Sequence, residues 1–465
     1  MNALLKKIYE MSPALIQDLM VTGYGLKLYR REYGTKFYRT LKEFIDRQWY
    51  SKEQLKHYQE ERLRLLILHA YENVPYYNSV MKSCKLTPDD IMTIEDLPKL
   101  PLLTREIIRA RMDDLVDKNV NKFRLPRGST NGTTGSPLKL YWDNQTCLVK
   151  NVVDWRQKHV AGVAPGDRIA FLLGREVVPT KRNEPPFWRH NWILNHLYFS
   201  TYHFSMKTAP FYIDELYAFK PKAIEGYPSS LCLLAKYLND TNTTYPLKAV
   251  FCSSEPLLLH QRRIIEKAFA CKVFDFYGMA ERVIFATECE HHMGKHINSD
   301  YGIVEIQNND LSNSEFGRTG RIISTALHSY SMPFIRYQTS DITALLPDDC
   351  PCGRKFPLME NITVRDVEIL TTRDGRFIIP AIISGIYDHL TGIYELQFVQ
   401  EDRDLIVMNL VKSPTYAASD SQYLLGEMKR IMGNDMRFEI KFADHIPRTA
   451  AGKYRWMISK IPFQF

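Results

Sequence analysis

The feature that most constrains the fold is an alternation of short strand-like runs with helix-like runs between about residues 125 and 345. Apolar runs rich in β-branched and aromatic residues predict buried strands at 167–173, 248–254 and 271–278. Residues 256–269 have the apolar spacing of a helix. Such alternation is typical of α/β proteins in which helices cover a partly parallel sheet. We therefore expect a multi-layer α/β fold.

Other patterns on either side predict more than one domain. Runs at 301–307, 321–327 and 341–346 indicate a meander or a β-barrel-like part of the same large domain. Farther on, a hairpin, an amphipathic helix and another strand are predicted at 394–401 with 404–411, at 421–432 and at 437–443. We predict an N-terminal domain of residues 1–361, a hinge at 362–366 and a small mobile α+β domain at 367–465.

The first part of the chain, to about residue 110, has a helical pattern that includes a capping box beginning at Ser51. Near its start, apolar and basic side chains are interspersed, namely Leu4, Leu5, Leu15, Ile16 and Leu19 with Lys6, Lys7, Arg30, Arg31 and Lys36. The simpler interpretation is an amphipathic helix whose apolar side docks on the protein. Peripheral association with a membrane surface is the alternative.

Charge and hydropathy exclude several classes of protein. A net charge of +8 is mild for 465 residues, and no nucleic-acid-binding motif accompanies it, so we expect no nucleic-acid partner. No apolar run approaches the ~18 residues of a membrane span. Lys6 and Lys7 interrupt the first apolar stretch before a signal-peptide core can form. We therefore expect a cytoplasmic protein, and the sequence does not indicate its oligomeric state.

One loop has the composition of a phosphate-binding site. Arg-Gly-Ser-Thr-Asn-Gly-Thr-Thr-Gly-Ser-Pro-Leu at 127–138 combines three glycines with several hydroxyl side chains. Glycines let a phosphate approach backbone N–H groups, and the hydroxyls add donors. An ordinary polar turn is the alternative. The candidate phosphate ligands are Ser129, Thr130, Gly132, Thr133, Thr134 and Gly135.

Four further motifs follow this loop in a fixed order. They are Asp-Phe-Tyr-Gly-Met-Ala-Glu at 275–281, Met-Pro-Phe-Ile-Arg-Tyr-Gln-Thr-Ser-Asp at 332–341, Val364-Arg365, and Pro-Arg-Thr-Ala-Ala-Gly-Lys at 447–453. With the loop, they resemble the adenylate-forming (acyl-AMP) ligase superfamily. Within it, the chain is most similar to phenylacetate–CoA ligases and their relatives in capsular-polysaccharide biosynthesis. The resemblance extends from about Leu65 to the C-terminus.

The resemblance implies a role for each motif. The nucleotide pocket would use Ser254, Glu255, Phe276, Tyr277 and Gly278, and Asp341 would accept hydrogen bonds from the ribose hydroxyls. Arg365 matches a hinge arginine, and Lys453 matches the catalytic lysine that reaches the α-phosphate. Glu281, four residues after Tyr277, would hold Mg²⁺ on the phosphate oxygens. A solvated helix carboxylate is the alternative for Glu281.

These roles imply an enzyme that uses ATP and Mg²⁺ to activate a carboxylate as acyl-AMP, then transfers the acyl group to CoA or to an amine such as an amino sugar. Ser136 stands where many relatives have lysine, Asn131 replaces a smaller residue, and Val367 occupies the usual pivot position. Because of these departures, a nucleotide-binding scaffold with eroded catalysis remains an alternative. No concentrated run of lysine and arginine marks a groove for the phosphates of CoA, so an amide-forming ligase that acts directly on a sugar-linked acid or amino sugar without CoA is another alternative.

A cysteine and histidine cluster predicts a second metal site. Cys289, His296, Cys350 and Cys352 supply the four sulfur and nitrogen ligands of a structural zinc site. Cys-x-Cys is a less common zinc motif than Cys-x-x-Cys, and scattered buried cysteines are the alternative. Similar clusters in phenylacetate–CoA ligase-like proteins favour zinc, with His291 and His292 as competing ligands.

Residues 175–203 are the candidate substrate segment, because they mix aromatic side chains with Arg175, Arg182, Arg189 and His190. A pocket for a plain fatty acid would be more uniformly apolar. The segment therefore favours a polar or sugar-linked acid as substrate. An irregular surface loop with an aromatic underside is the alternative.

Overall fold

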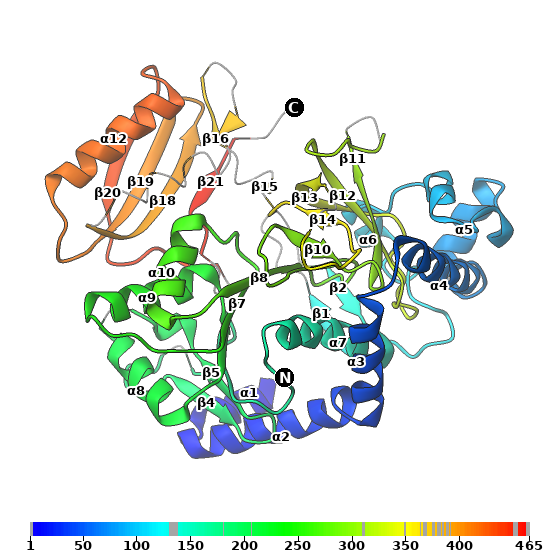
Figure 1. Cartoon of the computed structure of the whole chain (residues 1–465), viewed down its shortest axis with the longest axis horizontal. Helices are drawn as coiled ribbons and strands as arrows, with labels where there is room; N and C mark the ends of the chain where they lie inside the picture. Colours follow the sequence, from blue (N-terminus) through cyan, green and yellow to red (C-terminus); the bar gives the residue numbers. More distant parts are fainter. Residues whose placement is uncertain are drawn as a thin grey trace.

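The computed structural model of the chain describes residues 3–129, 138–179, 181–205, 207–308, 312–347, 350–362, 364–365, 370–373, 377–378, 383, 386, 390, 392–449 and 454–461. These residues form a large unit built on one mixed sheet and a smaller unit with a separate sheet (Figure 1). The described part of the large sheet has 13 strands.

Parallel strands form one half of the large sheet, as the alternating pattern predicts. Their order is β5–β3–β6–β7–β8, and β4 adds an antiparallel edge beside β5. The strands are β3 Ile169–Leu172, β4 Trp188–Asn191, β5 His196–Phe199, β6 Ala223–Gly226, β7 Ala249–Ser253 and β8 Val273–Gly278. Strands β3, β7 and β8 confirm the three strands predicted for this region.

Helices cover both faces of these strands. One apolar cluster joins α8, α9 and α10 to the sheet, and another joins α3 and α7 to the opposite face. Val250 and Phe251 of β7 belong to different clusters, because successive side chains of a strand point to opposite faces. The helices are α3 Thr35–Arg47, α7 Asn144–Val160, α8 Ala209–Phe219, α9 Pro228–Asp240 and α10 Leu259–Phe269. Helix α10 confirms the helix predicted at 256–269.

Antiparallel strands continue the sheet from β8 in the order β9–β10–β14–β13–β12–β11, and β15 pairs with β13. They are β9 Phe285–Glu288, β10 Lys295–Ile297, β11 Gly302–Gln307, β12 Thr319–Ala326, β13 Tyr337–Leu346, β14 Leu358–Met359 and β15 Val364–Arg365. Strands β11, β12 and β13 confirm the predicted meander. A separate hairpin consists of β1 Arg127–Ser129 and β2 Lys139–Tyr141.

The N-terminal part is helical in the structure. Its helices are α1 Ala3–Met11, α2 Ala14–Glu32, α4 Lys52–Asn73, α5 Pro75–Ser83 and α6 Arg105–Ala110, and its short 3₁₀ turns are η1 Pro88–Asp90 and η2 Ile94–Lys99. A further 3₁₀ turn, η3 Thr201–His203, follows β5. The Ser51 hydroxyl accepts from the Gln54 N–H, and the Gln54 side chain accepts from the Ser51 N–H, so the predicted capping box is present.

The first two helices differ from the simpler sequence-based interpretation. The apolar side chains that were expected to dock on the protein are exposed, namely Leu4, Leu5, Leu15, Ile16 and Leu19. Helix α2 instead docks on β4 through polar and small residues such as Gln17 and Gly25. Within the described part of the chain, none of the helices has the length and apolar character needed to cross a bilayer.

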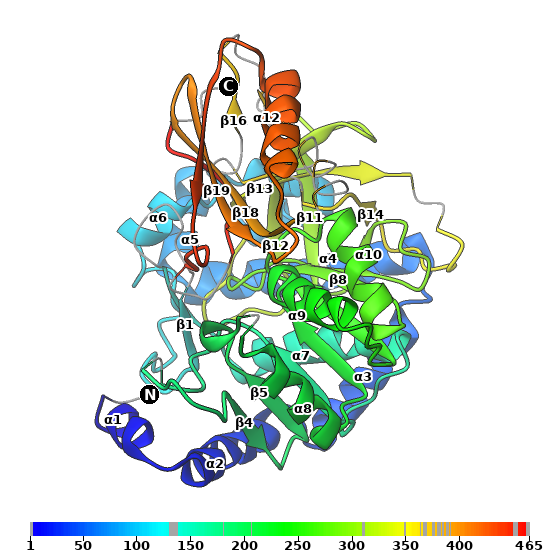
Figure 2. The same ribbon diagram turned by 90° about the vertical axis from the view of Figure 1, so that its left-hand side faces the viewer.

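The smaller unit has a core of its own. Its sheet has the order β20–β19–β18–β21, and α12 lies along this sheet (Figure 2). The elements are β16 Leu370–Thr371, β17 Phe377–Ile378, β18 Ile393–Asp402, β19 Leu405–Lys412, α12 Ala418–Met432, β20 Arg437–Phe442 and β21 Met457–Ser459. The predicted hairpin, helix and strand are confirmed, whereas the short β21 was not predicted. The limits of the predicted domains and hinge remain a prediction.

Candidate functional site

The site is built around a contact between the end of β8 and strand β13. Tyr277 is the next-to-last residue of β8, and its phenol Oη donates to Asp341 Oδ2 of β13 at 2.6 Å. Gly278 follows, and a Cβ at this position would lie 3.1 Å from the Phe285 ring. Glycine therefore allows β9 to approach closely beside Tyr277. Two residues predicted to contact the nucleotide, far apart in sequence, are in direct contact.

Glu281 lies in the same region and is buried. Its carboxylate Oε1 accepts from the Tyr337 hydroxyl at 2.9 Å and lies 3.9 Å from the Arg105 guanidinium. Burial raises the pKa of Glu281 above its usual value, and the nearby charge of Asp341 raises it further. The structure therefore contradicts the alternative of a solvated helix carboxylate. Two carboxylates close enough to repel each other are a suitable environment for a divalent cation.

Asp341 is positioned by the strands on either side of it. Its N–H donates to the Thr339 hydroxyl at 3.1 Å, and in the ladder it stands opposite Arg365 of β15. The predicted ribose ligand and the predicted hinge arginine are therefore paired in the backbone. The Arg365 side chain is not among the described features, so its role stays a prediction.

The predicted phosphate loop connects the two strands of the β1–β2 hairpin. Thr130, Gly132, Thr133, Thr134 and Gly135 lie outside the described residues, as do Asn131 and Ser136. For Ser129 only the backbone is described, and it pairs with Lys139. At the base of the hairpin, Gly128 faces the Trp142 ring so closely that a Cβ would lie 1.9 Å from it.

The end of β7 contacts the smaller unit. Ser254 is exposed and has a φ of 69°. The Glu255 carboxylate accepts from the Ser229 N–H at 3.2 Å and from the Tyr454 N–H at 2.6 Å, and burial raises its pKa. Tyr454 follows Lys453, the predicted catalytic lysine, which lies outside the described residues. Glu255 therefore joins the predicted nucleotide wall to the C-terminal segment.

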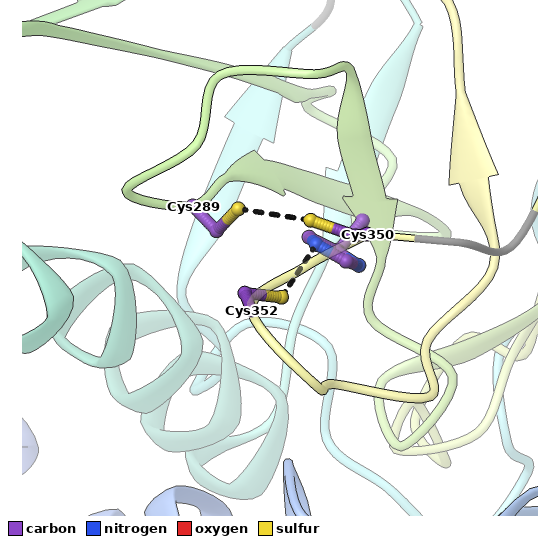
Figure 3. Close-up of side chains that lie close together, drawn as sticks. Cys289, Cys350 and Cys352 are labelled. Atoms are coloured by element: carbon purple, nitrogen blue, oxygen red, sulfur yellow. Dashed lines mark hydrogen bonds between the residues drawn. The ribbon is translucent and has the colours of Figure 1, made fainter.

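The four predicted zinc ligands lie together. One ligand atom from each of Cys289, His296, Cys350 and Cys352 falls within 4.8 Å of all the others. Cys289 Sγ is 3.5 Å from Cys350 Sγ, and Cys352 Sγ is 3.3 Å from His296 Nε2 (Figure 3). The cluster joins the region around β9 and β10 to the segment before β14.

The orientation of His296 suits a metal ligand. Its Nδ1 lies 3.1 Å from the Phe356 carbonyl oxygen, so this nitrogen is the donor and Nε2, facing Cys352, has the lone pair. Of the competing histidines, His292 contacts the Glu288 carboxylate at 3.0 Å through Nδ1. His291 approaches the cluster through its backbone N–H, 3.4 Å from Cys289 Sγ.

Much of the candidate substrate segment packs inside the protein. Arg189 is fully buried, and its Nε donates to Gln17 Oε1 of α2 at 2.6 Å. His190 Nε2 lies 3.0 Å from the Glu215 carboxylate. By contrast, Arg175 is exposed and lies over the Tyr198 ring at 5.4 Å. Of the basic side chains in this segment, Arg175 is thus better placed than Arg189 or His190 to meet a ligand.

Sequence reasoning missed three residues that support the site. Tyr337 and Arg105 contact Glu281, and Tyr454 contacts Glu255. Tyr337 belongs to the motif at 332–341, and its place inside that motif was a usable signal. No local pattern marks Arg105 or Tyr454, because their partners are far away in the sequence.

Comparisons with known proteins agree with this arrangement. Residues 370–460 match the CapK C-terminal domain family. Protein CapK of Staphylococcus aureus is 28% identical over an alignment that spans 98% of this chain and 100% of CapK. A phenylacetate–coenzyme A ligase of Escherichia coli is 27% identical over an alignment that spans 75% of this chain and 80% of the ligase.

A solved structure shares the fold. The 2-hydroxyisobutyryl-CoA ligase in its postadenylation state superposes with a TM-score of 0.70, at 22% identity, over 86% of this chain and 89% of that one. In its thioesterification state the same ligase gives a TM-score of 0.58, at 21% identity, over 88% and 91%. The overall arrangement of this chain is thus closer to the former. The chain is thus similar along nearly its whole length to CapK and over most of its length to a phenylacetate–coenzyme A ligase, and it shares the fold of 2-hydroxyisobutyryl-CoA ligase.

Proposed function

We propose that the enzyme uses ATP to activate a small-molecule carboxylate and then transfers the acyl group to the thiol of CoA. The observation that carries this proposal is the contact of Tyr277 with Asp341 beside the buried Glu281. This contact brings an aromatic ring and two carboxylates together, which supports the proposal that Asp341 binds the ribose and that Glu281 binds the cation. An aromatic ring can cover the base of a nucleoside triphosphate, and carboxylates can accept from the ribose hydroxyls and bind the cation on the phosphates.

The reaction has two balanced steps. A carboxylate oxygen forms a bond to the α-phosphorus of ATP while the bond to pyrophosphate breaks. The sulfur of a thiol then adds to the acyl carbonyl carbon, its proton passes to water, and AMP leaves with the electrons of the broken C–O bond. In the first step Asp341 would hold the ribose, Lys453 would approach the α-phosphate, and the phosphate loop would hold the β- and γ-phosphates in line.

Magnesium fits the residues at this site. Glu281 has a raised pKa because it is buried, and part of the shift comes from Asp341. A bound cation would remove this repulsion and would supply charge neutralisation to the phosphates. Glu281 is the residue that would hold it, oriented by the Tyr337 hydroxyl.

We also propose that the cysteine and histidine cluster binds a structural zinc ion. Three thiols and one imidazole make a complete tetrahedral set, with no ligand position left for catalysis. The mutual distances and the orientation of His296 support this proposal. The ion would link the β9–β10 region to the segment around Cys350.

The biological role that we propose is in surface-polysaccharide biosynthesis. Its support is the similarity to CapK along the full length of both chains, together with the match of residues 370–460. A polar or sugar-linked acid would suit the exposed Arg175 beside Tyr198. This substrate class is more specific than the activity itself and is tested separately.

Pyrophosphate exchange into ATP, measured with a panel of aliphatic, aromatic and sugar acids, tests the activation step. We expect exchange with at least one acid, and a fall of about 100-fold in Asp341→Asn, because the amide loses one of two strong acceptors for the ribose. Asp113→Asn changes an exposed carboxylate that belongs to none of the motifs and pairs with Lys122, and it should retain exchange. Mass spectrometry of products with CoA or with amino sugars then identifies the acceptor.

Either of two results would overturn this proposal. The first is full exchange activity in Asp341→Asn, which would remove the role given to Asp341. The second is ATP binding with no exchange for any acid of the panel, which would favour the nucleotide-binding scaffold. Formation of an amide in place of a thioester would retain the activation step and replace CoA as acceptor.

A further inference from the structure

The helices α1 and α2 expose large apolar side chains. The exposed fractions reach 65% for Leu4, 77% for Met11, 62% for Leu15 and 51% for Leu19. In α1, positions 4, 8 and 11 recur at the helical period, and in α2 positions 15, 19 and 26 do the same. Each helix therefore presents a continuous apolar stripe to solvent. Scattered surface leucines would not line up in this way.

The docked side of α2 explains why the stripe stays outside. Gln17 accepts a hydrogen bond from the buried Arg189, and Asp18 accepts from the His190 N–H at 3.0 Å. Gly25 lies against Asn191, where a Cβ would be 2.2 Å from the amide. Turning the helix to bury its leucines would break the contacts of Arg189 and press a side chain into Asn191. The exposed stripe is thus a fixed property of the fold.

A tryptophan and a second apolar residue extend the stripe. Trp192 and Ile193, in the turn between β4 and β5, are 48% and 44% exposed. The Trp192 N–H donates to the Thr22 hydroxyl of α2 at 3.3 Å, so this turn lies beside the helix. Tryptophan is enriched where an apolar layer meets polar headgroups.

The surroundings of the stripe are basic. Between residues 3 and 36 the sequence has six basic and three acidic side chains. Glu10 lies 3.6 Å from Lys6, Asp18 accepts from the His190 backbone, and Glu32 pairs with Arg31. The exposed basic side chains on α1 and α2 include Lys7, Lys27 and Arg30.

We propose that this surface binds the face of an anionic lipid bilayer. We define the α1–α2 surface as Leu4, Leu5, Ile8, Met11, Leu15, Ile16, Leu19, Leu26, Trp192 and Ile193 with the basic side chains around them. The apolar side chains would enter the boundary of the acyl chains, and the lysines and arginines would reach lipid phosphates. A symmetric contact between two copies would bring these like charges together, so the bilayer is the favoured occupant.

The position of the surface leaves the smaller unit uncovered. Helices α1 and α2 lie at the end of the molecule opposite the C-terminal sheet in both views (Figures 1 and 2). Binding along this end would hold the enzyme beside the membrane without covering the smaller unit.

Cosedimentation of the full chain with vesicles tests this inference. We expect binding to phosphatidylcholine vesicles that contain about 30% phosphatidylglycerol, and weaker binding to phosphatidylcholine alone or at high salt. The triple variant Leu4→Gln, Leu15→Gln, Leu19→Gln should bind at least tenfold more weakly, because three half-inserted leucines are lost. Replacing Lys7 and Arg30 by glutamine should reduce the preference for the anionic lipid.

The matched control is Leu65→Gln with Leu68→Gln, since these residues are 47% and 45% exposed on α4, outside the surface. Their double variant should bind like the parent. The inference is overturned if the parent binds neither kind of vesicle, or if the triple variant binds as well as the parent. It is also overturned if the parent is a dimer that the triple variant makes monomeric, because the surface then joins two copies. Pyrophosphate exchange should be unchanged in the triple variant without lipid.

Discussion

At the scale of single residues, Glu281 and Glu255 are both buried carboxylates but have different partners. Burial raises the pKa of both. Glu281 accepts from the phenol of Tyr337, and the Arg105 guanidinium lies 3.9 Å from its carboxylate. Glu255 accepts from two backbone N–H groups, which makes it a joint between segments.

Replacing Glu281 by glutamine should remove activity while leaving the fold at least as stable. A raised folded-state pKa means that the ionised carboxylate opposes folding above that pKa, and that this penalty disappears below the unfolded pKa of about 4.3. We therefore expect Glu281→Gln to melt at or above the parent at pH 7 without Mg²⁺. The difference should shrink as the pH falls through the window between the two pKa values. Thermal melts across this window measure it.

A surface carboxylate provides the control for this prediction. Glu315 lies in an exposed pair with Arg318, and its side chain is 76% exposed. Glu315→Gln should change neither exchange activity nor the pH dependence of melting. A Glu281→Gln protein that keeps full exchange activity with Mg²⁺ would contradict the role proposed for Glu281.

At the scale of elements, the cysteine and histidine cluster joins parts of the sheet that are far apart in sequence. His296 lies in β10, Cys289 directly follows β9, and Cys350 and Cys352 lie between β13 and β14. Strand β14 pairs with both β10 and β13, so the cluster lies next to the point where these strands meet. A metal ion here would hold β10, β13 and β14 together, where β14 pairs with each neighbour through only Leu358 and Met359.

Replacing one ligand should therefore lower stability markedly. We expect Cys350→Ser to lose zinc and to melt about 5 °C or more below the parent, because the free energy of metal binding is part of the free energy of folding. Cys84→Ser, which changes an exposed cysteine, should retain zinc and the parent melting temperature. Metal analysis of the purified proteins and thermal melts provide the measurements. Less than about half an equivalent of zinc in the parent would contradict the proposed site.

At the scale of the whole molecule, several contacts join the two units close to the candidate site. Besides the Glu255–Tyr454 hydrogen bond, Lys236 of α9 donates to the Ile393 and Tyr394 carbonyl oxygens at 3.2 and 2.9 Å. Leu258, at the start of α10, belongs to the apolar core of the smaller unit. These contacts hold the segment that follows Lys453 at the end of β7.

Removing the Glu255 carboxylate should slow formation of the acyl-AMP more than its later use. Glu255→Ala leaves two N–H groups without this charged acceptor, which costs about 1.5–3 kcal/mol per strong hydrogen bond. We expect acyl-AMP formation to slow about tenfold or more, with a smaller effect on transfer from supplied acyl-AMP to CoA. Single-turnover measurements of each step separate the two effects.

The control for Glu255→Ala lies on the outer side of the smaller unit. Asp404 pairs there with Arg437. Asp404→Ala should leave both steps unchanged. Equal slowing of both steps in Glu255→Ala would instead indicate a general loss of structure.

The sequence alone determined the layers of the fold and the identity of most candidate site residues. Short apolar runs specified β3, β7 and β8, since a buried strand needs apolar side chains on both faces. The motif order pointed to Tyr277, Glu281 and Asp341. These signals are local, because they lie in the composition and spacing of neighbouring residues.

Only the tertiary structure decided which of these groups meet and which surfaces remain outside. Glu281 contacts Tyr337 of β13 and Arg105 of α6, and no short-range sequence pattern connects these three residues. The same holds for α2, whose leucines face solvent because Arg189 and Asn191 of β4 require a polar and a small residue opposite. A helical sequence pattern predicts that one face of the helix is apolar, but the surface of the protein on which the helix packs decides which face is buried.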